Sequence, residues 1–224
     1  MNTIPVIAID GPSASGKGTV AQAVATELGF HYLDSGALYR IVGLAVMRAN
    51  KNLDNESEVI SILLKINIKF INNVVLLDAA DVSEAIREEP VSVAASKVGA
   101  HAKVRQALLD RQRAFRQAPG LVADGRDMGS VVFPDSVLKI YLTAGVKARA
   151  ERRYKQLIGK GLGANMAALL QELMLRDQRD SERAVAPLKR GADAVEVDTT
   201  NLSAEQSIAR VLLLYQQSAE EKSC

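Results

Sequence analysis

Residues 6–28 read VIAIDGPSASGKGTVAQAVATEL. The apolar, β-branched run at 6–9 predicts a buried strand, and the helical spacing of Val20, Val24 and Leu28 predicts a helix after it. The glycine-rich loop between them is typical of a polyphosphate site, in which backbone N–H groups, the helix N-terminus and Lys17 attract anions. A glycine-rich turn that merely links strand to helix is the alternative. The residues of this phosphate loop are Gly11, Pro12, Ser13, Ala14, Ser15, Gly16, Lys17, Gly18 and Thr19.

Gly18 stands where the general motif carries a Ser or Thr whose hydroxyl oxygen binds magnesium. The hydroxyl comes one residue later, on Thr19. A GKGT ending resembles the nucleoside monophosphate kinases, in which the metal is held mainly by nucleotide phosphates and water. We therefore expect ATP as the bound nucleotide and Mg²⁺ as a cofactor that arrives with it, through water near Thr19 and Asp124. We expect no metal site built by the protein alone.

The composition is that of an ordinary folded domain. The chain has 224 residues, of which 48% are apolar and 24% charged, so we expect one domain over 1–224. A net charge of +2 and an aromatic content of 4% argue against nucleic-acid binding. No apolar run is long enough to span a membrane, and the first ten residues lack a signal pattern. We expect a cytoplasmic monomer with no membrane or nucleic-acid partner, and its single cysteine, Cys224, excludes an internal disulfide.

Short apolar runs recur along the chain with helical patterns between them, which indicates a parallel α/β sheet. We expect five parallel strands with helices on both faces, at 6–9, 31–33, 121–123, 138–142 and 194–197. Ligands of such sheets bind beyond the carboxyl ends of the strands. Asp10, Asp34, Asp124 and Asp198 all lie at those ends. Ser35 is expected to cap the helix that follows.

An insertion interrupts this pattern. Two apolar runs flank Asn72 and Asn73, which predicts a hairpin. An antiparallel piece over about 62–100 does not belong to a parallel sheet, so we expect a small inserted α+β lobe over 36–104.

Two further features lie in the second half of the chain. Three glycines and Lys160 make residues 154–165 a candidate for a short mobile connection between helices. Ser203 and Gln206 match a capping box for a last helix that runs through Leu214.

A second charged segment follows the predicted strand at 121–123. Asp124 is our candidate for orienting magnesium-bound water, although an aspartate that merely opens a turn at Gly125 would give the same pattern. Arg126 and Asp127 leave the same loop, toward the same edge of the sheet.

Arginines recur later on one predicted helix face, as Arg176, Arg179 and Arg183. Such a run is ordinarily a solvated surface. Transfer between two phosphates, however, brings anions together, and each unit pair repels by about 4 kcal/mol at about 4 Å and an effective dielectric constant of about 20. Several cations are therefore needed. The residues expected to carry the transfer are Lys17, Asp124, Arg126 and Arg183, with Arg40 as a further cation.

Three segments together resemble the bacterial cytidylate kinase family. They are LDSGALYR at 33–40, ADGRDMGSVVFPD at 123–135 and RDQRDSERAVAPL at 176–188. With the phosphate loop they occur in order along nearly the whole chain. The resemblance implies a P-loop kinase core with a five-stranded parallel sheet, a short lid and an enlarged acceptor lobe. Ser130 departs from the family pattern, in which Thr is expected.

The same resemblance implies CMP as the acceptor. Its phosphate would contact Ser35, Arg40, Arg126 and Arg183, its ribose Arg176 and Asp180, and its base Ser96, Arg105 and Asp127, with Tyr39 bordering the pocket. Cytosine presents an amine beside acceptor atoms, which suits a carboxylate next to a donor, so we expect CMP to be preferred over UMP. For Ser96 and Arg105 the alternative is an ordinary place on a helix surface.

The implied reaction is transfer of the γ-phosphoryl group of ATP to CMP or dCMP, in pyrimidine nucleotide metabolism. It needs no general base, because a phosphate monoester with a second pKa of about 6 is already ionised at neutral pH. Two alternatives stay open. One is another small-molecule kinase, acting on UMP, AMP or a hydroxyl acceptor, and the other is a nucleotide-dependent switch or ATPase.

Overall fold

The computed structural model describes residues 4–71, 74–159, 161 and 163–221. The chain divides into two compact units, of which the first comprises Met1–Asp34 and Arg113–Cys224 and the second Ser35–Gln112. Asn72, Asn73, Lys160 and Cys224, which the sequence interpretation used, lie outside the described residues.

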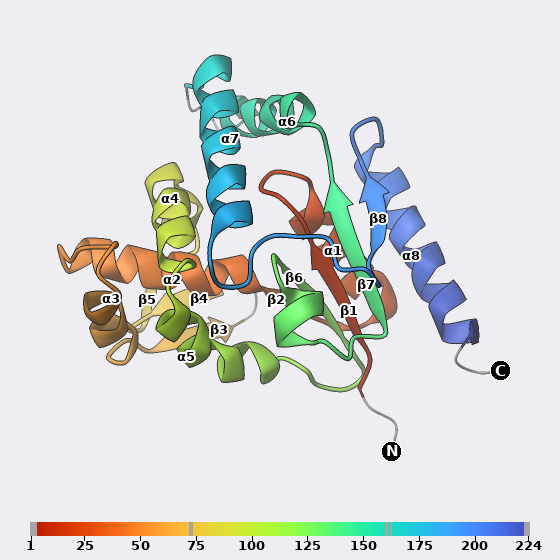
Figure 1. Ribbon diagram of the computed structural model, residues 1–224, viewed down its shortest axis with the longest axis horizontal. Coiled ribbons are helices and arrows are strands. Elements are labelled where there is room, and N and C mark those ends of the chain that lie inside the picture. Colours follow the sequence, from red (N-terminus) through yellow and green to blue (C-terminus); the bar gives the residue numbers. More distant parts are fainter. Residues whose placement is uncertain (1–3, 72–73, 160, 162, 222–224) are drawn as a thin grey trace. The chain divides into compact units, whose positions relative to one another are not determined.

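The first unit is built on a five-stranded parallel sheet with the order β2–β6–β1–β7–β8 (Figure 1). The strands are β1 (Val6–Asp10), β2 (His31–Asp34), β6 (Leu121–Gly125), β7 (Leu138–Thr143) and β8 (Val195–Asp198). β1 is the central strand, and its Ala8 lies opposite Ala123 of β6 and Lys139 of β7. The predicted α/β fold and all five predicted parallel strands are confirmed.

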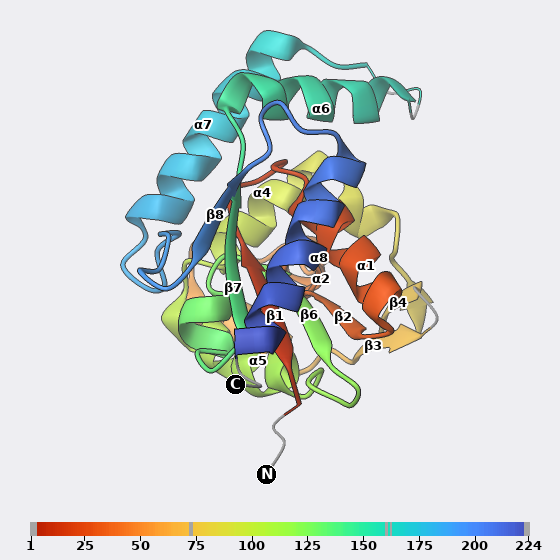
Figure 2. The same cartoon turned by 90° about the vertical axis from the view of Figure 1, so that its right-hand side faces the viewer.

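The helices of this unit are α1 (Lys17–Leu28), α6 (Val146–Gly159), α7 (Met166–Glu182) and α8 (Ala204–Glu221), with a π-helical turn η2 (Met128–Val132). α1 and α8 run together over one face of the sheet (Figure 2). Val24 and Val211 pack there against Ile9 and Ile140 in a single buried cluster. α6 and α7 pack against each other (Figure 1).

Two predicted boundaries in this unit are wrong. Residues 154–159 of the expected mobile connection are helical, because α6 continues to Gly159. The last helix continues past Leu214 to Glu221, since nothing in the residues after Leu214 breaks a helix.

The second unit contains helices and a small sheet of its own. The elements are α2 (Ser35–Arg48), α3 (Glu56–Leu63), β3 (Ile68–Ile71), β4 (Val74–Leu77), β5 (Ala80–Asp81), the short turn η1 (Ala85–Arg87), α4 (Glu89–Val98) and α5 (Ala102–Arg113), whose last residue belongs to the first unit. β3 and β4 are antiparallel, with Ile68 opposite Leu77, so the predicted antiparallel pairing is confirmed. The two-residue strand β5 was not predicted.

Close packing of α2 on α4 gives this unit its core. A Cβ atom at Gly43 would lie 3.0 Å from the Ala94 side chain and 3.2 Å from its backbone, so the helices approach too closely for a larger residue at 43. Ile41, Val75 and Ile86 fill the core between α2 and the small sheet.

Ser35 does not act as the predicted helix cap. β2 runs directly into α2, and Ser35 is the first helical residue. Its hydroxyl oxygen accepts a 2.8 Å hydrogen bond from the Nε2 of Gln112 on α5.

Among the described residues, no helix combines the length and apolar character needed to cross a bilayer.

The capping box at the start of α8 is confirmed in both directions. Ser203 Oγ accepts from the Gln206 N–H at 3.2 Å, and Gln206 Oε1 accepts from the Ser203 N–H at 2.9 Å. We expect Ser203→Ala to lower the free energy of unfolding by about 1 kcal/mol, because one helix N–H loses its partner. Urea unfolding followed by circular dichroism measures this loss. Ser218→Ala, which removes only the bond from Ser218 Oγ to the Tyr215 carbonyl, is the control, and an equal loss there would contradict the assignment.

Candidate active site

The phosphate loop, residues 11–19, takes a shape that only particular residues allow. A Cβ atom at Gly11 would lie 2.0 Å from the Leu142 carbonyl oxygen, so the loop lies directly against the β7 backbone. Gly16 and Ala14 have left-handed backbones, with φ values of 92° and 58°. Alternating right- and left-handed residues turn successive N–H groups toward one point, which forms a concavity for an anion.

Two arginines of α6 hold the loop from outside. Arg149 is buried and donates from Nη1 to the Ser13 carbonyl at 3.1 Å, while Asp177 of α7 accepts from the same guanidinium at 3.1 and 2.5 Å. Arg152 Nη1 donates to the Ser15 carbonyl at 3.1 Å. Because these carbonyls are bonded on the outer side, the loop keeps its N–H groups for a ligand.

Thr199, after β8, is a third outer support. Its Oγ1 donates to the Ser15 carbonyl at 3.1 Å. The Ser15 hydroxyl itself is buried and has no partner within the described part of the chain. A buried polar atom of this kind in a phosphate loop suits a ligand that supplies the missing hydrogen bond.

Lys17 is buried at the start of α1. Its Nζ donates to the Pro12 carbonyl at 3.1 Å and lies 3.9 Å from Asp124 Oδ1. Burial, together with the positive charge of Arg126, lowers the pKa of Lys17 from 10.5 to about 7, and Asp124 only partly opposes this. In the free protein the ammonium form of Lys17 therefore lacks sufficient negative charge around it.

Asp124 explains the unusual Gly18. A Cβ atom at position 18 would lie 3.1 Å from Asp124 Oδ2, which is tighter than most such contacts. Tyr32 OH donates to the same oxygen at 3.4 Å. A side chain at position 18 would therefore crowd the Asp124 carboxylate. The simple turn-opening alternative for Asp124 leaves its burial beside Lys17 unexplained.

Arg126 connects the phosphate loop with α7. Its Nη2 donates to Ser13 Oγ at 2.7 Å, and its Nε donates to Asp180 Oδ2 at 2.9 Å. Although burial disfavours the charged guanidinium, the attraction of Asp180 raises the pKa of Arg126. Burial likewise works against ionised Asp180, but Arg126 and Arg176 outweigh it and hold the Asp180 pKa below its usual value. The pair is therefore ionised at neutral pH.

The remaining arginines of the α7 segment are not simply a solvated surface. Arg183 follows the last residue of α7, and its Nε donates to the Ala186 carbonyl at 2.7 Å. The Nε atom of Arg176 is buried. Arg179 Nε donates to the Leu175 carbonyl of its own helix at 3.4 Å.

Asp127 is only 2% exposed and immediately precedes η2. The first two N–H groups of that turn, on Met128 and Gly129, donate to the Asp10 carboxylate at 2.8 and 2.9 Å. Burial raises the pKa of Asp10 from 3.8 to about 7, although these two bonds act in the opposite direction.

The predicted base-binding residues of the second unit form a group of their own. The Arg105 guanidinium carbon lies 5.5 Å from the centre of the Tyr39 ring, and Arg105 Nη1 donates to the Gly99 carbonyl at 3.1 Å. Ser96 and Arg105 are each 8% exposed, so the alternative of a helix-surface position is wrong for both. Ser35 and Arg40 lie on α2 of the same unit.

The structure therefore gathers the predicted residues in two sets. In the first unit they are Lys17, Asp124, Arg126, Asp127, Arg176, Asp180 and Arg183 together with the phosphate loop; in the second they are Ser35, Tyr39, Arg40, Ser96 and Arg105. Three residues that shape the site, Arg149, Arg152 and Asp10, have no role that the sequence predicts. For the two arginines the only signal was a basic run, ARAERR at 148–153, which an exposed helix would also show.

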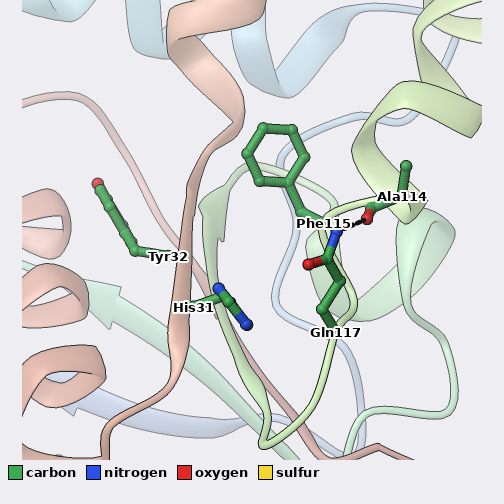
Figure 3. Close-up of a pocket in the computed structure, with 5 residues that line it drawn as sticks. All are labelled: His31, Tyr32, Ala114, Phe115 and Gln117. Carbon is green, nitrogen blue, oxygen red and sulfur yellow. Dashed lines mark hydrogen bonds between the residues drawn. The ribbon is translucent and has the colours of Figure 1, made fainter. Parts of the chain in front are cut away.

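A separate hollow of about 410 Å³ lies beside strand β2 (Figure 3). His31, Tyr32, Ala114, Phe115 and Gln117 line it, and Gln117 Nε2 donates to the Ala114 carbonyl at 3.3 Å. His31 Nε2 lies 3.0 Å from the Ala118 carbonyl, which fits a structural role for this histidine.

Comparison with known proteins identifies related sequences along almost the entire chain. The family model described as Cytidylate kinase matches residues 7–217. The cytidylate kinase of Burkholderia pseudomallei strain K96243 is 57% identical over 213 residues, which cover 95% of this chain and 93% of that protein. The cytidylate kinase of Polynucleobacter asymbioticus is 55% identical over 216 residues, covering 96% and 98%.

A solved structure supports the fold. A gluconokinase from Sinorhizobium meliloti 1021 superposes with a TM-score of 0.50 at 16% identity, covering 100% of this chain and 98% of that one. At this identity the likeness concerns the architecture of the P-loop kinases alone.

The lowered pKa of Lys17 predicts that nucleotide binding takes up a proton. At pH 8 about nine-tenths of Lys17 is neutral in the free protein, because its pKa is about 7. A bound polyphosphate favours the ammonium form and raises that pKa, so about one proton enters per ATP at pH 8. At pH 6 the ammonium is already formed, and Lys17 takes up little. Isothermal titration calorimetry in buffers of different ionisation enthalpy measures the uptake.

Lys17→Arg is the control for this experiment, because a guanidinium stays protonated at pH 8. The variant should bind ATP without the pH-dependent uptake. Equal uptake by the variant and the parent protein would contradict the assignment to Lys17.

Proposed function

Because the chain belongs to the cytidylate kinase family, we propose that it transfers the γ-phosphoryl group of ATP to CMP, forming ADP and CDP in pyrimidine nucleotide metabolism. The observation that carries the proposal is the 2.7 Å hydrogen bond from Arg126 to Ser13. It joins an arginine assigned to the acceptor phosphate with the loop that holds the donor phosphates. No observation favours a hydroxyl acceptor or a simple ATPase.

The chemistry follows from charge neutralisation and alignment. The acceptor phosphate is already an anion at neutral pH, so no side chain has to remove a proton from it. Lys17, Arg126 and Arg183 offset the repulsion between this anion and the γ-phosphate. Arginine suits the acceptor because its planar fork binds two phosphate oxygens at once. In-line attack then requires the two phosphates to be held in register.

Mg²⁺ fits this site as a companion of ATP. Within the described ranges, no three His, Cys, Asp or Glu side chains are grouped to hold a metal ion. Asp124 offers a buried carboxylate beside the loop, and Thr19 offers an exposed hydroxyl. A bound Mg²⁺ would supply charge neutralisation at the phosphate oxygens. We propose that Asp124 orients its water ligands.

We also assign the acceptor contacts by family resemblance. The phosphate is bound by Ser35, Arg40, Arg126 and Arg183, the ribose by Arg176 and Asp180, and cytosine by Ser96, Arg105 and Asp127, with Tyr39 at the border of the base. The closeness of Arg105 to Tyr39 supports this, because the stacked guanidinium is fixed for base contact. We expect dCMP to be accepted as well, since it presents the same base and the same phosphate to these residues.

Three broader parts of the proposal rest on sequence and family. Residues 36–104 act as the acceptor-binding lobe and residues 154–166 as a lid, both of which exclude water during transfer. The protein works as a cytoplasmic monomer. Its partners are nucleotides alone, in keeping with its small net charge of +2.

Replacing the phosphate-loop lysine tests the proposed reaction. Lys17→Ala should reduce kcat for CMP phosphorylation by at least about 100-fold, because the cation between the two phosphates is removed. Its thermal midpoint should stay within about 4 °C of the parent protein. A coupled ADP-release assay and scanning calorimetry measure both. Lys65→Ala, at an exposed lysine of the second unit, is the control. Near-normal turnover by Lys17→Ala would overturn the assignment.

Base preference tests the role of Asp127. Initial rates with CMP, dCMP, UMP and AMP should rank CMP first. Asp127→Ala should lower the CMP-to-UMP ratio of kcat/KM by about tenfold or more, because uracil turns a carbonyl oxygen toward the carboxylate where cytosine turns an amine. An unchanged ratio would reject the proposed cytosine contact.

A further inference from the structure

One partly buried carboxylate at the active site has no part in the transfer described above. Asp10 is the last residue of β1 and directly precedes Gly11, the first residue of the phosphate loop. Its side chain reaches across to the loop that follows β6. Oδ1 accepts from the Met128 N–H at 2.8 Å and Oδ2 from the Gly129 N–H at 2.9 Å. Each carboxylate oxygen thus binds one of two consecutive backbone N–H groups.

These two N–H groups open the turn η2. The residue before that turn, Asp127, makes no side-chain cap bond to it, so the Asp10 carboxylate fills that place from another strand. The bonds also fix the backbone of Asp127, whose carbonyl accepts from the Val131 N–H at 2.9 Å at the other side of the turn. Charge-assisted bonds to backbone N–H groups are among the stronger hydrogen bonds in proteins.

The surroundings leave this loop little room to adjust without Asp10. A Cβ atom at Gly125 would lie 2.8 Å from the Met128 side chain, and one at Gly129 would lie 3.1 Å from Lys139. The loop is therefore packed on both sides of Asp127.

We infer that Asp10 is a positioning residue for acceptor recognition, which aims Asp127 at the base by holding the Met128 and Gly129 N–H groups from the start of the phosphate loop. This inference rests on the proposed function for its consequence, the choice of cytosine. The structural part of the inference does not rest on it; this part is the pair of hydrogen bonds from the Met128 and Gly129 N–H groups to the Asp10 carboxylate, which we call the tether. Because Asp10 adjoins Gly11, the same residue sets the base-recognition loop relative to the loop for the donor phosphates.

The kinetic test uses Asp10→Asn in the full-length protein at pH 8. The amide keeps the volume and one acceptor oxygen, but its NH₂ group faces the second backbone N–H, so one bond is lost. We expect KM for CMP to rise and the CMP-to-UMP ratio of kcat/KM to fall by about tenfold. KM for ATP and kcat at saturating CMP should change by less than about threefold, since neither depends on aiming Asp127. If KM for CMP, KM for ATP, kcat and the CMP-to-UMP ratio all worsen by a similar factor, the role of Asp10 is merely structural and the inference is overturned.

A double-mutant cycle with Asp127→Ala separates action through Asp127 from any other route. If Asp10 works by aiming that carboxylate, Asp10→Asn should lower the CMP-to-UMP ratio in the parent protein and should have no further effect on it in the Asp127→Ala background. Equal fold-changes in both backgrounds would overturn the inference. Asp135→Asn is the matched control, because this exposed carboxylate near the same turn pairs with Arg116 at 2.7 Å, and its substitution should leave the ratio unchanged.

Hydrogen exchange distinguishes a failure of this inference from a failure of the proposed function. In Asp10→Asn the amides of Met128 and Gly129 should exchange at least about tenfold faster, while the amides of β7 and α8 keep their rates. Unchanged exchange at these two positions would overturn the tether whatever the substrate is. A parent protein that does not phosphorylate CMP, combined with faster exchange at these amides, would overturn the proposed function and leave the tether standing.

Discussion

The active site depends on how the carbonyl groups of the phosphate loop are bonded. A loop that presents its N–H groups to an anion must turn its carbonyl oxygens away, and those oxygens need donors of their own. Lys17 supplies one for Pro12, Arg149 one for Ser13, and Arg152 one for Ser15. All three donors are cations, so the groups that hold the loop in shape also make its surroundings positive.

Concentrated positive charge must in turn be balanced in the absence of nucleotide. Asp177 pairs with Arg149 and Asp180 with Arg126, and the latter pair lies in a buried site where an unpaired charge would be costly. Lys17 differs from these two arginines, because the Asp124 carboxylate oxygen beside it is 3.9 Å away and its pKa is lowered to about 7. The missing negative charge at Lys17 is what a polyphosphate supplies. The charges of the site are therefore balanced when a polyphosphate is bound and not when the site is empty.

Much of the fold follows from patterns that are local in sequence. The β-branched run at 6–9, the periodicity of Val20 and Val24, and the capping box at Ser203 each concern neighbouring residues, and each appears in the structure as predicted. The site could be predicted where family motifs mark it. Arg149, Arg152 and Asp10 could not, because their partners lie 136, 137 and 118 residues away in the chain. Ser35 was misjudged because β2 continues into α2 without a linker, so the serine lies inside the helix.

The order in which these contacts become available along the chain has a consequence for synthesis on the ribosome. The central strand β1 pairs with residues 121–125 and 138–141, and Ser15 receives its outer support from Thr199. A nascent polypeptide from which Thr199 has not yet emerged therefore cannot complete the nucleotide-binding site. The loop is therefore translated before the residues that support it, and it becomes competent only after they have been made.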